Sequence, residues 1–155
     1  MDWIGSLIDW RLFGVIAGKV TLAYLLALPI GWEREQVQHS VGVRTFPLVA
    51  MASCGYVLLA GTLMTPDTEA ARSRIIQGLT TGIGFIGGGA IMRGRGNVHG
   101  TATAASIWNT GVIGAAVAGS HFEIAIILSL INLITLHLLV PLKERAGQAG
   151  HKAPK

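Results

Sequence analysis

Long apolar runs separated by short polar or charged gaps dominate this chain. The hydrocarbon core of a bilayer is about 30 Å thick, so a helix needs about 20 mostly apolar residues to cross it. Five segments are read as such runs: Leu12–Gly31, Thr45–Met64, Ile75–Met92, Thr101–Ala118 and Phe122–Val140. The pattern predicts an all-α, polytopic transmembrane helical bundle of about five spans over residues 1–141, with a short basic cytoplasmic tail at 142–155.

The five segments differ in how plainly they resemble a span. Ile75–Met92 is very rich in glycine, while Thr101–Ala118 is rich in small residues and is less hydrophobic. Full spans and re-entrant or tilted packing therefore both stay open for these two segments. The first segment contains Lys19 and Pro29, whereas the last carries one acidic residue, Glu123, near its start and closes at Pro141.

The basic residues predict the orientation, because lysine and arginine are enriched in cytoplasmic loops. If the N-terminus lies outside, the inner side holds Arg34, Arg44, Arg93, Arg95, Lys143, Arg145, Lys152 and Lys155, and the outer side holds Arg11, Arg72 and Arg74. This asymmetry predicts an N-terminus outside and a C-terminus inside. The first ten residues carry acidic rather than basic side chains, so the first span is expected to be retained rather than cleaved as a signal peptide.

Composition excludes a soluble domain. Of the 155 residues, 51% are hydrophobic and 13% are charged, against about 25% charged in a typical soluble domain. The net charge of +4 does not indicate a nucleic-acid partner, because the basic residues lie in the short gaps between apolar runs. A single cysteine, Cys54, excludes an intramolecular disulfide and any cysteine-rich metal site.

Two short patterns resemble enzyme motifs and are rejected. The segment Gly82–Gly87 matches GxGxxG, but it lies inside an apolar helix and no acidic residue follows at the spacing that dinucleotide binding requires. His121-Phe122-Glu123 resembles half of a zinc-deaminase motif, but the cysteine pair is missing. The sequence predicts no enzyme, no catalytic residue and no cofactor.

Small residues at helical spacing mark the third and fourth segments. In lipid, helices associate through close backbone approach at small residues, and such residues include Gly78, Gly82, Gly84, Gly88, Gly111 and Ala115. One interpretation is a tight helical hairpin around residues 94–100. The other is that the glycines form a thin, deformable wall beside a site or a partner helix.

A charged cluster follows the first span and precedes the second: Glu33, Arg34, Glu35 and Arg44. These residues either set the topology at the interface, or one glutamate pairs with Arg44 or Arg93 in a polar patch at the cytoplasmic face. Such a patch would contact a partner subunit or a hydrated cation. Two carboxylates suit Mg²⁺, but the neighbouring arginines oppose it, so the sequence does not support a metal site.

Lys19 is the most unusual polar residue, because a lysine near the bilayer centre costs about 2.5–3.5 kcal/mol. It either snorkels outward or points into the bundle, where Asn109, Thr110, Asn132 or His137 are the expected neighbours. Asn109 and Asn132 act either as ligands or as hydrogen-bonding contacts between helices. An interior polar site around Lys19 is the hypothesis.

Four blocks in order carry a family resemblance: Gly31–Glu35, Gly42–Thr45, Gly82–Gly89 and Thr103–Trp108. This series resembles the membrane domain of the MgtC/SapB family, from about Arg11 to Gly119. The resemblance implies a five-span protein of the bacterial inner membrane, linked to survival under low magnesium. It implies a regulatory role, and well-known members are associated with restraint of the proton-translocating ATP synthase. Members have also been labelled magnesium-transport subunits, and they commonly carry a soluble C-terminal domain, where this chain has only Leu142–Lys155.

Three functions from different classes stay open. The first is an intramembrane regulator that binds another membrane complex, such as the ATP synthase. The second is a magnesium or cation transporter or channel subunit, which would need several acidic groups within the spans. The third is a structural assembly protein. The scarcity of intramembrane carboxylates favours the first over the second, and a homo-oligomer is compatible with all three.

Overall fold

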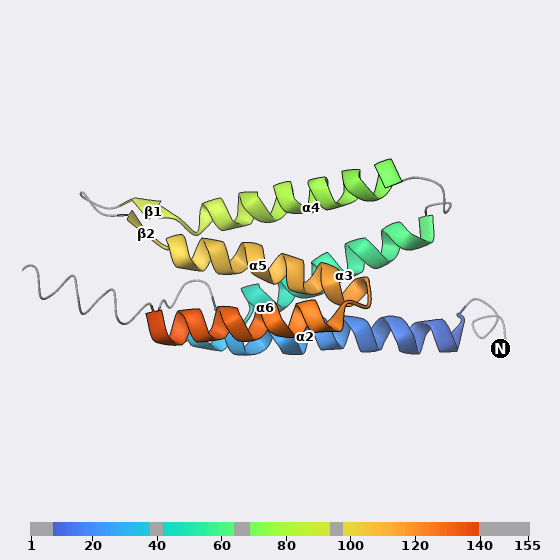
Figure 1. Cartoon of the computed structure of the whole chain (residues 1–155), viewed down its shortest axis with the longest axis horizontal. Helices are drawn as coiled ribbons and strands as arrows, with labels where there is room; N and C mark the ends of the chain where they lie inside the picture. Colours follow the sequence, from blue (N-terminus) through green and yellow to red (C-terminus); the bar gives the residue numbers. More distant parts are fainter. Residues whose placement is uncertain (1–7, 38–41, 64–68, 94–97, 140–155) are drawn as a thin grey trace, which may run out of the picture.

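The computed structural model describes residues 8–37, 42–63, 69–93 and 98–139. The predicted tail at 142–155 lies outside these residues. Five α-helices, one π-helical turn and a two-stranded hairpin follow in the order α2 (Trp10–Val37), α3 (Thr45–Leu63), α4 (Glu69–Gly89), β1 (Met92–Arg93), β2 (Val98–His99), α5 (Thr101–Ala118), α6 (Phe122–Ile134) and η1 (Thr135–Leu139). The helices lie side by side along one long axis (Figure 1). The predicted fold class, an all-α membrane bundle, is confirmed.

Helix α2 is longer than the predicted span. Asp9 begins it, since its side-chain carboxylate accepts the backbone N–H groups of Arg11 at 3.0 Å and Leu12 at 3.1 Å, as an N-cap residue does. The helix does not end at Gly31, because the glutamate, arginine and glutamine residues that follow are good helix formers. It runs to Val37, so Glu33, Arg34 and Glu35 lie on the last turns of this helix, while Arg44 lies in the turn before α3.

Helix α4 is displaced toward the N-terminus relative to the predicted Ile75–Met92. It begins at Glu69 and ends at Gly89, and residues 92 and 93 instead form strand β1. This strand pairs antiparallel with β2, so that Met92 lies opposite His99. Gly100 then enters α5 with φ +84°, and a Cβ atom there would collide with the carbonyl of Ala90. A glycine is therefore required where the hairpin meets α5.

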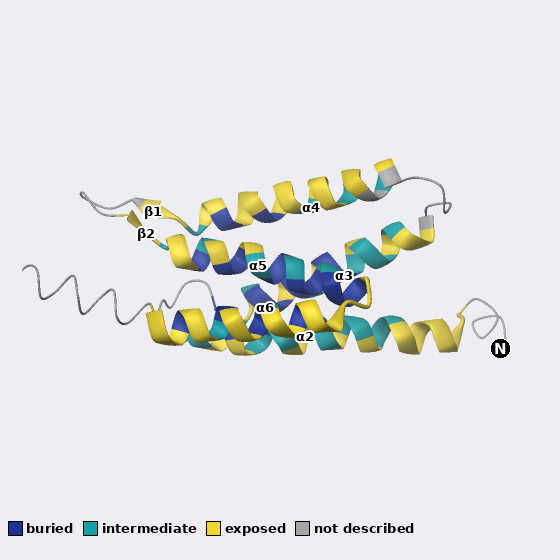
Figure 2. Ribbon diagram, in the orientation of Figure 1, coloured by how far each residue is buried: buried dark blue, intermediate teal, exposed yellow. Residues whose placement is uncertain are grey.

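Helix α5 lies at the centre of the bundle and packs against α2, α3, α4 and α6. It carries the densest set of buried residues (Figure 2). Two glycines allow this packing, since a Cβ on Gly114 would collide with the Ala50 carbonyl of α3, and one on Gly87 of α4 would lie 3.2 Å from the Ala104 carbonyl. Close helix contact through small residues is the main source of packing energy in lipid.

Many large apolar side chains are exposed on the helices, as expected for a bundle embedded in a bilayer. Within the described residues, α2, α3 and the continuous α6–η1 helix are each long and apolar enough to cross a membrane. Helices α4 and α5 are less apolar but unbroken, with 21 and 18 residues, or about 31 and 27 Å. Helix α5 can be less apolar because the surrounding helices shield much of its surface from lipid. Helix α4 has no such shield, because most of its residues are exposed (Figure 2).

Candidate functional site

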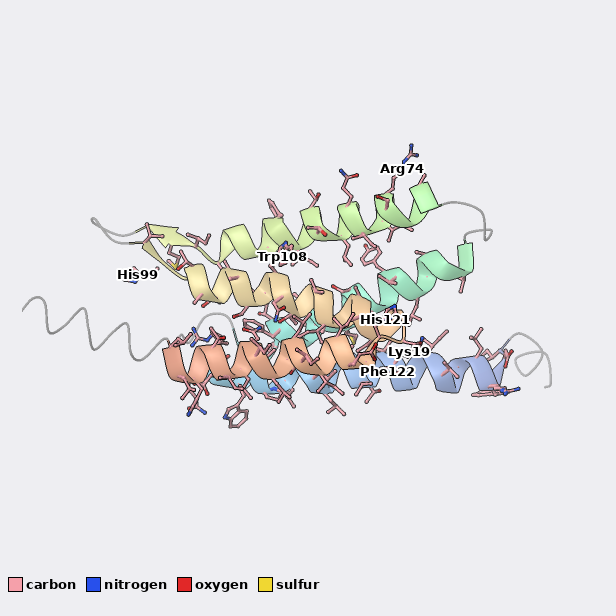
Figure 3. All side chains as sticks on the ribbon, viewed as in Figure 1. Lys19, Arg74, His99, Trp108, His121 and Phe122 are labelled. Carbon is pink, nitrogen blue, oxygen red and sulfur yellow. The ribbon has the colours of Figure 1, made fainter. Side chains whose placement is uncertain are left out.

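Lys19 links α2 to the turn between α5 and α6. Its ammonium group donates one hydrogen bond to the carbonyl of Ala118 at 2.8 Å and another to the hydroxyl of Ser120 at 2.9 Å. Figure 3 shows it beside His121 and Phe122. A cation at the C-terminal end of α5 satisfies a free helix carbonyl and complements the helix dipole. Lys19 therefore caps α5.

This position differs from the interior polar site expected around Lys19. None of the expected neighbours bonds to it. Asn109 instead donates to the carbonyl of Leu128 at 3.3 Å, and Thr110 donates to the carbonyl of Ser106 in its own helix at 2.7 Å. The physical reason is depth, because the ammonium reaches the turn at one end of the bundle instead of its middle.

A polar seam, formed by Ser106, Asn109, Ser129 and Asn132, joins α6 to α5 and α2. The Ser106 hydroxyl donates to the Asn132 side-chain carbonyl at 2.9 Å. Ser129 donates to the carbonyl of Leu26 on α2 at 2.7 Å. These bonds connect helices, so both asparagines make interhelical contacts. The two serines were not singled out in the sequence, although Ser129 and Asn132 lie one turn apart in an otherwise apolar helix.

Glu33 meets the π-helical turn at the end of α6. Its carboxylate oxygen lies 3.3 Å from Nδ1 of His137, and the two side chains are 20% and 70% exposed. Irregular turns of this kind often mark functional positions in helices. The contact joins the charged end of α2 to the end of the chain's last described helix.

Glu35 has a different partner. Its carboxylate accepts the backbone N–H of Val43 at 3.2 Å, and a Cβ on Gly42 would collide with the same carboxylate. The expected pairing of either glutamate with Arg44 is not formed among the described residues. Residues 33 and 35 point about 200° apart around a helix, so each reaches a different neighbour. The Arg93 side chain lies outside the described residues.

The two arginines of the cluster are in contrasting positions. Among the described residues, Arg34 is the largest fully buried side chain, 2% exposed, and it continues the buried stripe of α2 formed by Ala23, Ala27 and Ile30. Arg44 is exposed. Arg34 therefore belongs to the packed interior at this end of the bundle, while Arg44 is available at its surface.

The glycines of α4 differ from the expected hairpin packing. Within the described residues, a Cβ atom placed on Gly78, Gly82, Gly84 or Gly88 would meet nothing within 4 Å. Only Gly87 closely approaches α5, because α4 faces that helix through Ile83 and Gly87. In α5, by contrast, Gly111 is buried against Ile83, and Ala115 is half-buried.

The uncovered side of α4 includes a stripe of polar and small residues. Gln77, Thr81, Gly84 and Gly88 follow at i, i+4, i+7 and i+11, so they share one helix face, and all four are exposed. We call these four residues the outer α4 face. The Thr81 hydroxyl donates a hydrogen bond to the backbone carbonyl of Gln77 at 2.8 Å, within α4. The outer α4 face thus exposes the side-chain amide of Gln77 and the backbone of two glycines.

No cluster of three or more histidine, cysteine, aspartate or glutamate residues within metal-binding distance occurs in the described ranges. The carboxylates of Glu33 and Glu35 are held by separate partners. Several of the described polar residues, among them Lys19, Glu33 and Ser106, instead connect different helices of the bundle.

Comparison with known proteins places this arrangement in a family. The chain is 36% identical over 126 residues to Protein MgtC of Salmonella typhimurium, covering 81% of this chain and 53% of that protein. It is 32% identical over 146 residues to Protein SrpB of Synechococcus elongatus, covering 87% and 75%. It is 32% identical over 132 residues to YhiD of Escherichia coli K12, a candidate magnesium transporter by its name, covering 82% and 61%.

The chain thus spans between about half and three quarters of the length of these relatives. No solved structure is significantly similar to it. The family model for the MgtC family matches residues 20–145, which include α3 to η1 and α2 from Val20 onward, while Lys19 lies just before the matched range. This chain is a membrane protein that belongs to the MgtC family.

Proposed function

We propose that this protein is a non-enzymatic regulator in the bacterial inner membrane, linked to adaptation to low magnesium. It acts by binding another membrane complex through the outer α4 face, and the proton-translocating ATP synthase is the proposed complex. Family membership supports the link to magnesium.

The observation that carries this proposal is the uncovered state of α4. In lipid, an exposed glycine pair such as Gly84 and Gly88 leaves a shallow face that fits a second helix better than mobile acyl chains. An exposed glutamine in a helix at membrane depth is costly, and an interhelical hydrogen bond from Gln77 would offset that cost. Both features suit a helix of a partner protein.

The test is ATP hydrolysis by inverted membrane vesicles, with and without this protein at matched expression. The proposal predicts a lower rate in its presence, and the substitution Gly84→Leu restores the rate because it fills the shallow face. The matched control is Gly14→Leu on α2, where a Cβ atom also meets nothing within 4 Å. That variant is expected to inhibit as the wild type does. An unchanged rate with the wild-type protein would contradict the ATP synthase as the partner.

Magnesium transport is the alternative function, and it is favoured by the name of YhiD. It predicts Mg²⁺ flux into proteoliposomes that contain the purified protein. It also predicts a higher rate of ATP hydrolysis in the vesicles if cation movement dissipates the gradient. The two assays therefore give opposite results for the two functions.

A further inference from the structure

A long apolar groove runs between α3 and α4, on a different side of α4 from the outer α4 face. It has a volume of about 730 Å³ and is lined by Thr45, Leu48, Tyr56, Ile75, Gly82 and Ile86, among others. It exists because α4 presents Gly78 and Gly82 where side chains would otherwise fill the space, and a Cβ on either meets nothing within 4 Å in the described chain. In a bilayer, a space of this kind is filled by hydrocarbon or by another helix.

The length of the groove matches one leaflet. Its lining on α3 extends from Thr45 to Tyr56, eleven residues apart, or about 16 Å at the rise of an α-helix. Half of the hydrocarbon core is about 15 Å. Since Thr45 is the first residue of α3, the groove opens at one surface of the bundle and extends about half-way across.

An exposed arginine lies at the open end of the groove. Arg44 directly precedes Thr45 and is exposed, and it forms no ion pair with the described carboxylates. The carboxylate of Glu35, at the end of α2, accepts the backbone N–H of Val43 at 3.2 Å. Basic residues at the cytoplasmic surface attract anionic lipid headgroups, and the positive-inside pattern puts Arg44 at that surface.

At the far end of the groove, the described residues include no basic side chain that points toward it. The arginine next to Ile75 is Arg74, and Figure 3 shows its side chain pointing away from α3 and from the rest of the bundle. Among the described side chains, the charge at the groove is therefore asymmetric, with an exposed cation at the Thr45 end.

We propose that the groove between α3 and α4 binds an anionic phospholipid of the inner leaflet, with an acyl chain along the groove and the phosphate at Arg44. The occupant is a lipid rather than a helix because the groove is one leaflet deep and ends at an exposed arginine. This inference is independent of the proposed regulatory role, which concerns the outer α4 face.

The experiment is native mass spectrometry of the full chain released from nanodiscs of phosphatidylcholine and phosphatidylglycerol in equal amounts. The wild type is expected to retain phosphatidylglycerol in preference to phosphatidylcholine. The substitution Arg44→Gln lowers that preference about fivefold, the effect of one basic residue near an anionic headgroup. Arg74→Gln leaves it unchanged.

A second pair of variants tests the groove itself. Gly82→Leu fills it and is expected to abolish lipid retention, whereas Gly84→Leu, one of the four residues of the outer α4 face, retains lipid as the wild type does. Both positions have open space for the new side chain, and circular dichroism checks that each variant folds. Equal retention by the two leucine variants would overturn the proposal. So would loss of the preference in Arg74→Gln alone, or a protein dimer in place of the lipid adduct.

Discussion

Replacement of Lys19 by methionine is expected to destabilise the bundle, although it removes a charge from an apolar helix. The Lys19 ammonium holds two hydrogen bonds, to the carbonyl of Ala118 at 2.8 Å and to the hydroxyl of Ser120 at 2.9 Å. Lys19→Met keeps the length of the side chain and deletes both bonds. It also leaves a carbonyl at the end of α5 without its cap.

Two opposing free energies decide whether Lys19→Met stabilises or destabilises the bundle. A lysine at the centre of a membrane helix costs about 2.5–3.5 kcal/mol, but the Lys19 ammonium lies at the turn that contains the exposed residues Gly119, Ser120 and His121, where this cost is far smaller. Interhelical hydrogen bonds in membranes are worth about 0.6 kcal/mol on average. The two bonds together therefore contribute about 1–2 kcal/mol, and Lys19→Met lowers Tm by about 2–8 °C.

Thermal denaturation of the purified protein in detergent, followed by circular dichroism, measures this effect. The variant Ser120→Ala deletes one of the two bonds and is expected to lower Tm by about half as much. In the double variant the decrease in Tm is smaller than the sum of the two single decreases, since both single variants lose the bond between Lys19 and Ser120. A Tm for Lys19→Met equal to or above that of the wild type would refute the reasoning, because it would mean that burial of the charge outweighs its bonds.

Three further substitutions test the packing of α5. Gly114→Leu places a side chain against a backbone carbonyl of α3 and is expected to cost at least about 1–3 kcal/mol, whereas Gly55→Leu, with nothing within 4 Å, is close to neutral in the same denaturation assay. Ser106→Ala removes the donor to Asn132 and lowers stability by about 0.6–1.7 kcal/mol; no effect in the background of Asn132→Leu would confirm that the bond is responsible. Gly100→Ala forces a residue with a Cβ into φ +84° and against a carbonyl, so a stability loss above about 1 kcal/mol is expected, and an unchanged Tm would contradict the conformation of the hairpin.

The apolar runs predicted where the helices lie more accurately than where each helix begins and ends. Helix α5 covers Thr101–Ala118, the range read from the sequence, because a glycine precedes it and a glycine follows it. Helix α2 continues six residues past Gly31, the end of the predicted span, since polar residues with high helix propensity continue a helix beyond the lipid. The displaced start of α4 has the same cause, because its first turns are polar.

The partners of the polar residues could not be predicted, because they depend on how distant helices are placed. Lys19 bonds to a backbone carbonyl 99 residues away, and Glu33 meets a histidine 104 residues away. The small-residue pairs show the same limit. Gly84/Gly88 and Gly111/Ala115 have the same spacing, yet the first pair is exposed, whereas Gly111 is buried and Ala115 is half-buried. The spacing defines a face, and only the rotation of each helix in the bundle decides what that face meets.

The central claim is that the outer α4 face binds a subunit of the ATP synthase in the membrane. Site-specific photo-crosslinking in living cells tests it most directly, with a benzophenone amino acid placed at Gly84 on α4 or, as the control, at Leu25, an exposed position on α2. The account predicts a crosslink from Gly84, but not from Leu25, to a membrane subunit of the ATP synthase identified by mass spectrometry. Crosslinks from Gly84 to lipid or to a second copy of this chain, without that subunit, would contradict it.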